Sequence, residues 1–118
     1  MAIATTETRD GLLTVRQADE GDVIRLSLCG ELDLSNAKTL ETSLQQILAS
    51  GSHALVDLGK LEFLDSTGIN LLVLAMKDQE AGRLTFLPSE SPAVCRLLSL
   101  TGLDERLGLN SPQPPAPA

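Results

Sequence analysis

Residues 61–77 place two apolar runs back to back, with only four small residues between them. The first run, LEFL at 61–64, is typical of a strand, and the second, INLLVLAM at 69–76, is almost wholly apolar and typical of a buried helix. The link Asp65-Ser66-Thr67-Gly68 is too short for a long loop, so the strand has to pass directly into the helix. This junction restricts the chain to folds in which strands and helices alternate.

The flanking sequence continues the alternation. Runs at 12–16 and 23–29 flank the polar, glycine-containing link 18–22 and predict a hairpin. A helix follows, capped by Asp33 or Ser35 and ended by Gly51, and its predicted apolar face consists of Leu40, Leu44, Ile47 and Leu48. A strand at 54–58, ended at 59–60, precedes the junction. A strand at 84–87, a helix that starts at 91–92 and ends at 102, and a short helix or strand within 103–109 follow it.

The predicted order is therefore β-β-α-β-α-β-α. We expect an α/β domain with one mixed sheet, made of an N-terminal hairpin and later parallel strands, with helices packed on it. The domain is expected to span residues 11–109. Residues 1–10 are polar and residues 110–118 are rich in proline, so we expect both segments to be flexible.

Composition narrows the partners that such a domain can bind. The chain is 42% hydrophobic but has two Phe and no Trp or Tyr, so its core has to be aliphatic. Its net charge of −7 repels nucleic acid and anionic lipid, and it offers no aromatic platform on which bases could stack. We therefore expect neither a nucleic-acid nor a membrane partner, and favour a protein partner or a cation.

The sequence shows no sign of secretion or membrane insertion. The start MAIATTETRDG lacks the basic and apolar parts of a signal peptide, and no apolar run reaches the roughly 18 residues of a membrane helix. Cys29 and Cys95 form no C-x-x-C pair, which favours two small buried thiols over a disulfide. These features predict a protein of the cytoplasm.

The polar link at the junction has two direct interpretations. Any of its first three residues could cap the helix, while Gly68 allows a tight turn. A serine hydrolase would place its nucleophile at such a turn, but that pattern requires a glycine where this chain has Leu64. The single histidine, His53, lies in a polar turn, and no metal cluster, phosphate loop or dinucleotide motif is present. We therefore expect no catalytic residue, no cofactor and no metal.

Three blocks of the chain together resemble a known family. GELDLSNA at 30–37, LVDLGKLEFLDSTG at 55–68 and SPAVCRLLSLTGL at 91–103 are similar to blocks of the bacterial anti-sigma factor antagonists, small STAS-domain proteins. The likeness runs from about residue 10 to residue 109. It implies a STAS-like single domain with a regulatory, non-enzymatic role.

The resemblance also implies a mechanism. Such antagonists bind a serine-kinase anti-sigma factor and thereby release a sigma factor. The kinase inactivates the antagonist by phosphorylation, which a PP2C-type phosphatase reverses. The acceptor implied here is Ser66, and the implied partner-binding residues are Gly30, Glu31, Asp33, Asp65, Thr67, Gly68 and Ile69. Two alternatives stay open: a STAS subunit that binds and regulates an ABC-type transport ATPase, and a small serine hydrolase.

A phosphate at this junction is compatible with the fold. Phosphoserine carries about −1.5 to −2 charges, and a helix N-terminus favours negative charge by roughly 0.3 to 1 kcal/mol. The effect is therefore expected at the surface, where a partner would have to desolvate a dianion beside Asp65. Since the following helix is apolar in nearly every direction, we expect it to be sunk between the sheet and another helix, or to expose Ile69, Val73 or Met76 to the partner.

Overall fold

Strands and helices alternate along the chain as the sequence predicts, in a computed structural model that describes residues 4–77 and 83–109. The strands are β1 (Ala4–Asp10), β2 (Leu13–Asp19), β3 (Val23–Leu32), β4 (His53–Leu64) and β5 (Leu84–Leu87). The helices are α1 (Ala37–Ala49), α2 (Ser66–Lys77), α3 (Pro92–Leu100) and α4 (Leu103–Arg106). Residues 103–106 thus form a helix and not a strand.

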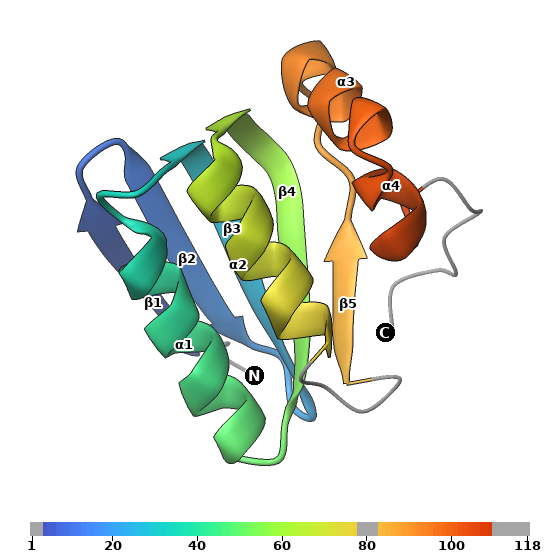
Figure 1. The fold of residues 1–118 in the computed structure, drawn as a ribbon. Coiled ribbons are helices and arrows are strands. Elements are labelled where there is room, and N and C mark those ends of the chain that lie inside the picture. The colour runs from blue at the N-terminus through green and yellow to red at the C-terminus, as the bar shows by residue number, and fades with distance from the viewer. Residues whose placement is uncertain (1–3, 78–82, 110–118) are drawn as a thin grey trace.

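The five strands form one mixed sheet in the order β1-β2-β3-β4-β5. The pairs β1–β2 and β2–β3 are antiparallel, while β3–β4 and β4–β5 are parallel. This confirms the predicted hairpin and the predicted parallel strands after it. Helices α1 and α2 lie side by side on one face of the sheet, and α3 and α4 lie beside β5 (Figure 1).

The core between the sheet and the helices is aliphatic, as the composition requires. Alternate residues of the central strands point into it, including Leu26 and Leu28 of β3 and Val56 and Leu58 of β4, all at most 1% exposed. Three of the four residues predicted for the apolar face of α1 are buried, and Leu48 is half-buried. Phe86 is the buried aromatic residue in this cluster.

Strand β1 corrects the expectation of a flexible N-terminal segment for residues 4–10, while residues 1–3 lie outside the described residues. It pairs with β2 along its whole length, from Ala4 opposite Asp19 to Asp10 opposite Leu13. The side chains of residues 5–9 are exposed, so the strand lacks the apolar alternation that reveals a half-buried strand. Backbone pairing and the β propensity of its threonines account for it. The tail predicted to be flexible, 110–118, lies outside the described residues.

Strand β4 corrects a second expectation, because it continues through the predicted break at 59–60. Its register with β3 shifts between Ser27 and Cys29, so an irregularity in the pairing absorbs the glycine without ending the strand. The Gly59 N–H donates to the Asp57 carboxylate at 2.8 Å. The strand thereby reaches Leu64 and carries the chain to the junction.

Both cysteines are free and exposed, which corrects the prediction of buried thiols. Cys29 follows the buried Leu28, so the two-residue period of β3 turns it away from the core. Cys95 follows the buried Val94 in α3, and its thiol donates to the Ser89 carbonyl at 3.1 Å. An apolar neighbour in the sequence therefore did not indicate burial at either position.

Candidate functional site

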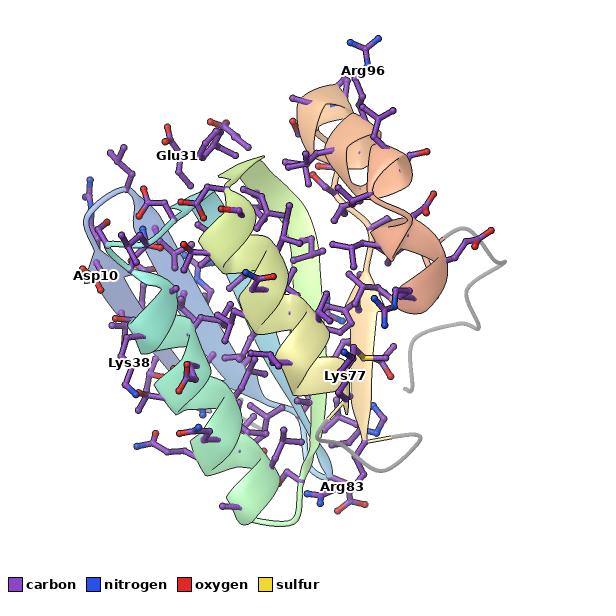
Figure 2. The ribbon with its side chains drawn as sticks, viewed as in Figure 1. Asp10, Glu31, Lys38, Lys77, Arg83 and Arg96 are labelled. Carbon is purple, nitrogen blue, oxygen red and sulfur yellow. The ribbon has the colours of Figure 1, made fainter. Side chains whose placement is uncertain are left out.

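The junction lies at the carboxyl ends of the parallel strands β3 and β4, the edge of such a sheet at which ligand sites usually form. β4 ends at Leu64 and α2 begins at Ser66, so a single residue, Asp65, connects them. This confirms that the strand passes directly into the helix. Glu31, near the end of β3, lies at the same end of the molecule (Figure 2).

Asp65 caps α2 and also holds the neighbouring loop. Its Oδ1 accepts a hydrogen bond from the Gly68 N–H at 2.9 Å, and its Oδ2 accepts one from the Leu34 N–H at 3.2 Å. The first bond satisfies an amide of the first helical turn, and the second joins the loop between β3 and α1 to the junction. Of the three predicted capping candidates, Asp65 is therefore the one that caps.

Ser66 is left without a structural task. It is exposed at the first position of α2, and within the described residues its hydroxyl has no hydrogen-bond partner. Thr67 beside it is half-buried. An enzyme that approaches this corner can therefore reach the Ser66 hydroxyl without breaking a bond of the fold.

Gly68 has a different role from the predicted tight turn. It is buried within α2, and its φ is not among the positive values of the described glycines. A β-carbon at this position would lie 2.6 Å from Leu64 Cδ1 and 3.0 Å from Leu32 Cγ. Glycine is needed here because the first turn of α2 packs closely on the ends of β3 and β4.

Near its end, β3 passes through Gly30, which has a φ of +101°. A β-carbon on Gly30 would collide with the Leu12 carbonyl oxygen, so this position requires glycine for both conformation and space. The Glu31 N–H donates to the same carbonyl at 3.0 Å. The β1–β2 turn is thereby joined to the end of β3, which flanks the junction.

The cap of α1 corrects another expectation. The N-cap position is occupied by Asn36 and not by Asp33 or Ser35. The Asp33 Oδ1 accepts instead from the Ser35 N–H at 2.9 Å and from the Ser35 hydroxyl at 2.6 Å, within the loop. Asp33 thus shapes the turn before the helix.

Asn36 is a positioning residue that the sequence analysis missed. Its side chain is 1% exposed, accepts from the Asp33 N–H at 2.9 Å and donates to the Glu31 carbonyl at 2.9 Å. It therefore fixes the start of α1 to the end of β3 and to the first residue of the loop beside Asp65. The available signal was an asparagine directly before a helix, which is equally typical of a simple cap.

The predicted site residues converge on one acidic corner. Glu31, Asp33 and Asp65 are half-buried, and none of them takes part in the ion pairs of the described residues. Ile69 differs from these residues, because it packs partly against the core. The structure therefore brings the loop and the junction together, with uncompensated carboxylates around Ser66.

Large apolar side chains surround the same corner, and the sequence did not reveal them as exposed. Leu12 is 63% exposed in the β1–β2 turn, Leu34 is 76% exposed in the loop, and Phe63 is 47% exposed near the end of β4. Register places Glu31 opposite Phe63. The corner therefore combines accessible apolar surface with negative charge, which suits a protein partner.

Helix α2 matches neither of its two predicted placements. Its neighbour α1 lies beside it in the same layer, so one side of α2 stays open (Figure 1). Ile69, Val73 and Met76, which were candidates for exposure, are only half-buried against the core. The exposed apolar residue is Leu74, at 57%.

His53 is far from Ser66. It begins the twelve-residue strand β4 that ends just before the junction, which at about 3.3 Å per residue places the two residues roughly 35 Å apart. Its Nε2 lies 2.9 Å from the Thr85 hydroxyl oxygen. The only histidine of the chain is therefore out of reach as a base for Ser66.

Residues 4–77 and 83–109 also bear on metal binding and on membrane insertion. No group of three or more His, Cys, Asp or Glu side chains is arranged to hold a metal ion there. None of the helices in these ranges has the length and apolarity needed to cross a bilayer.

Comparisons with known proteins agree with this geometry. A family model described as Mlab, STAS domain, matches residues 13–110. The chain is 35% identical over 101 residues to the anti-sigma-F factor antagonist RsfB of Mycobacterium tuberculosis, a match that covers 84% of this chain and 82% of RsfB.

Solved structures show the same architecture. An anti-sigma factor antagonist from Mycobacterium paratuberculosis superposes with a TM-score of 0.65 at 25% identity, covering 90% of this chain and 83% of that one. The anti-sigma factor antagonist SpoIIAA in its unphosphorylated form superposes with a TM-score of 0.61 at 23% identity, covering 86% of this chain and 84% of SpoIIAA. The second likeness concerns the fold alone.

Proposed function

The chain belongs to the STAS domain family, and we propose that it is a cytoplasmic anti-sigma factor antagonist controlled by phosphorylation of Ser66. In this proposal it binds an anti-sigma serine kinase, which frees a sigma factor. The kinase phosphorylates Ser66 and ends the interaction, and a PP2C-type phosphatase restores it. The observation that carries the proposal is the exposed Ser66 hydroxyl beside an aspartate that already caps the helix.

The unmodified corner is suited to close docking. Leu12, Leu34 and Phe63 supply apolar surface that a partner can cover. Among them lie five half-buried residues, namely Gly30, Glu31, Asp33, Asp65 and Thr67. The buried Gly68 and the half-buried Ile69 determine the shape of the surface from beneath. Because the carboxylates here have no ion pair within the described residues, the kinase surface is expected to present lysine or arginine to them.

Phosphorylation would change this surface without changing the fold. The phosphate would stand at the N-terminus of α2, where the helix dipole offsets part of its repulsion from Asp65. For the kinase, a dianion of about −1.5 to −2 charges added to an acidic corner must be desolvated on docking, which costs several kcal/mol. Direct exclusion is therefore sufficient to end binding, and no remote conformational change is required.

The proposal is tested with the ATP-binding protein that the full chain captures from its native cell. That protein, once purified, is incubated with this chain and ATP, and the phosphate is located by phosphopeptide mapping. We expect the phosphate on Ser66, none in Ser66→Ala, and normal incorporation in the matched control Ser99→Ala, which changes an exposed serine of α3. Phosphorylated chain that still binds the kinase as tightly as unmodified chain would overturn the proposal.

The same experiment distinguishes the alternative STAS function. A subunit that regulates an ABC-type transport ATPase would capture such an ATPase and would receive no phosphate on Ser66. That pair of results would replace the anti-sigma interpretation. An ester or peptide hydrolysis assay tests the hydrolase alternative, which lacks a histidine near Ser66.

A further inference from the structure

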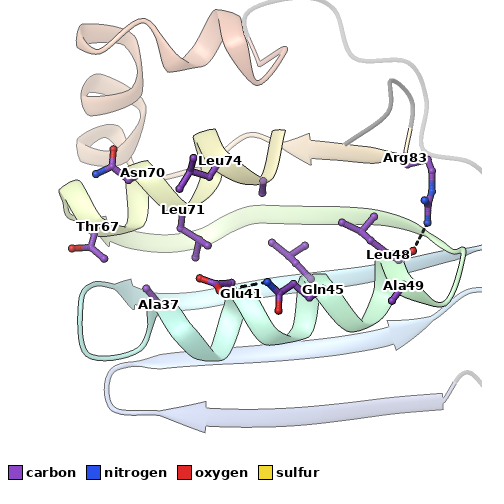
Figure 3. A pocket seen from close by; sticks show the side chains of 12 residues that line it. Ala37, Glu41, Gln45, Leu48, Ala49, Thr67, Asn70, Leu71, Leu74 and Arg83 are labelled. Carbon is purple, nitrogen blue, oxygen red and sulfur yellow. Dashed lines mark hydrogen bonds between the residues drawn. The ribbon is translucent and has the colours of Figure 1, made fainter. Parts of the chain in front are cut away.

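A groove between α1 and α2 lies outside the proposed switch. It has a volume of about 610 Å³, and its walls carry Leu44 and Leu48 from α1 and Leu71 and Leu74 from α2 (Figure 3). The small Ala49 and Ala75 leave room between these side chains. The groove is open along one side, where Leu74 is 57% exposed. Its size lies within the range of small-molecule sites in proteins.

One end of the groove holds a fixed cation. The Nη2 of Arg83 donates to the Leu48 carbonyl at 2.6 Å and to the Ser52 carbonyl at 3.1 Å, so the guanidinium is anchored at the C-terminal end of α1 (Figure 3). Within the described residues, Nη1 and Nε of Arg83 have no hydrogen-bond partner. An anchored guanidinium with free donors is suited to bind a carboxylate.

The acidic side chain on the groove wall is already compensated. Glu41 Oε1 accepts from Lys38 Nζ at 3.3 Å and from Gln45 Nε2 at 3.4 Å. Arg83 is therefore the charge on the groove wall that is left to attract a ligand. The groove thus offers an aliphatic trough with positive charge at one end.

We propose that this groove binds a single-chain anionic amphiphile of the fatty-acid type. The alkyl chain lies along the four leucines, and the carboxylate meets Arg83. No aromatic residue lines the groove, so a nucleotide base or another flat ring would find no stacking surface. α1 has 13 residues and is about 20 Å long, which accommodates an extended alkyl chain.

The proposal does not depend on the function of Ser66, although the two sites are neighbours. Thr67 lines the end of the groove opposite Arg83 and directly follows Ser66 in the sequence (Figure 3). A long alkyl chain would reach from Arg83 toward that end. Binding in the groove can therefore be tested without the kinase.

A tryptophan reporter makes the test direct, because the chain contains no Trp or Tyr. Thr42 is exposed on α1, three residues before the groove-lining Gln45, so Thr42→Trp introduces a single fluorophore beside the groove without replacing a residue of its wall. Dodecanoate, dodecanol and dodecyltrimethylammonium are titrated below their micelle concentrations. We expect a saturable emission shift with dodecanoate, at least tenfold weaker binding of dodecanol, and no saturable binding of the cation.

Variants then locate the ligand. In the reporter background, Arg83→Gln is expected to weaken dodecanoate binding about tenfold, since a hydrogen bond to a charged group is lost. Arg83→Lys keeps the charge and should recover part of the affinity, and Ala75→Phe should block the groove. The matched control Arg16→Gln changes an exposed arginine on β2, whose side chain is 63% exposed, and should have no effect.

Circular dichroism and melting of each variant check that the fold is intact. Because Arg83 also bonds the end of α1, Ala75→Phe provides the decisive variant if Arg83→Gln does not fold. Binding unchanged by Ala75→Phe, or equal affinity for dodecanol and dodecanoate, would overturn the proposal. Absence of saturable dodecanoate binding would also overturn it and would favour a helix of a partner protein as the occupant of the groove.

Discussion

Two helices of this protein begin with the same local device but use serine differently. At α3 the cap is Ser91, whose hydroxyl accepts from the Val94 N–H at 3.5 Å, and Pro92 takes the first helical position. At α2 the cap is Asp65, which accepts from the Gly68 N–H at 2.9 Å, and Ser66 takes the first helical position.

The difference separates a structural serine from a candidate regulatory one. Ser91 is half-buried, its hydroxyl serves the helix, and its own N–H donates to the Ser89 hydroxyl at 3.0 Å. The exposed Ser66 has a neighbour that does the capping, so its hydroxyl is not needed by the fold. A serine at a helix start is therefore a candidate for modification when another residue caps the helix.

The largest expected effect is on kinase binding, when a carboxylate is placed at the start of α2 or at the start of α3. Ser66→Asp should weaken binding of the captured kinase at least a hundredfold, about 2.7 kcal/mol, because the added carboxylate must be desolvated in the interface. Ser91→Asp should bind like wild type, since aspartate caps a helix as well as serine does. Binding is measured by titration calorimetry, with melting curves of both variants as the control for folding.

Two results would break the comparison. Equal loss of binding in both variants would place the docking surface over α3 as well as over the junction. A largely unfolded Ser66→Asp protein would show that the first position of α2 has a structural role after all.

The third helical residue provides the next test. A β-carbon added at Gly68 would lie 2.6 Å from Leu64 Cδ1. Gly68→Ala should therefore lower the free energy of unfolding by about 1–3 kcal/mol through overpacking. The equivalent Val94 is 1% exposed, and Val94→Ala should lower it by about 2 kcal/mol by leaving a cavity. Urea unfolding measures both. A neutral Gly68→Ala would mean that α2 can move away from β3 and β4.

The cap residues are expected to differ by a smaller amount. Asp65→Ala removes acceptors for the Gly68 and Leu34 N–H groups, so we expect a loss of about 1–2 kcal/mol in the free energy of unfolding. Ser91→Ala removes one long bond and should lose about 0.5–1 kcal/mol. Asp65→Asn keeps a capping oxygen and serves as the control. A larger loss for Ser91→Ala than for Asp65→Ala would contradict the assigned roles.

Most of the fold could be predicted because burial follows periodicity. Leu26 and Leu28 alternate inward along β3, and Leu40, Leu44 and Ile47 repeat along one face of α1. β1 could not be predicted in this way, because its side chains are exposed and its pairing with β2 is made by the backbone. The positions of Cys29 and Cys95 also escaped, since each directly follows a buried residue, Leu28 or Val94, and is turned outward by the geometry of its strand or helix.

The candidate site was predictable in part for a related reason. The order strand, Asp65, Ser66, helix indicates the junction, and several residues could have capped the helix. Only the distance from the Gly68 N to Asp65 Oδ1 assigns the cap to Asp65 and shows that the Ser66 hydroxyl is not needed as a cap. Leu34 escaped because its role depends on a contact between segments that are distant in sequence, the bond from its N–H to Asp65. Asn36 escaped for another reason: its bonds to Asp33 and Glu31 are local, and an asparagine before a helix is equally typical of a simple cap.

The smallest expected effect is the most specific test of the comparison. Ser66→Ala should change the free energy of unfolding by less than about 0.5 kcal/mol, because an exposed hydroxyl without a partner in the described residues is removed and alanine favours a helix. The same substitution should leave kinase binding intact and make it insensitive to ATP. Urea unfolding and calorimetry with and without ATP measure the two properties on one preparation. A loss comparable to that of Ser91→Ala would give Ser66 a structural role, because a residue that stabilises the helix start is not free to be modified without a change in the fold.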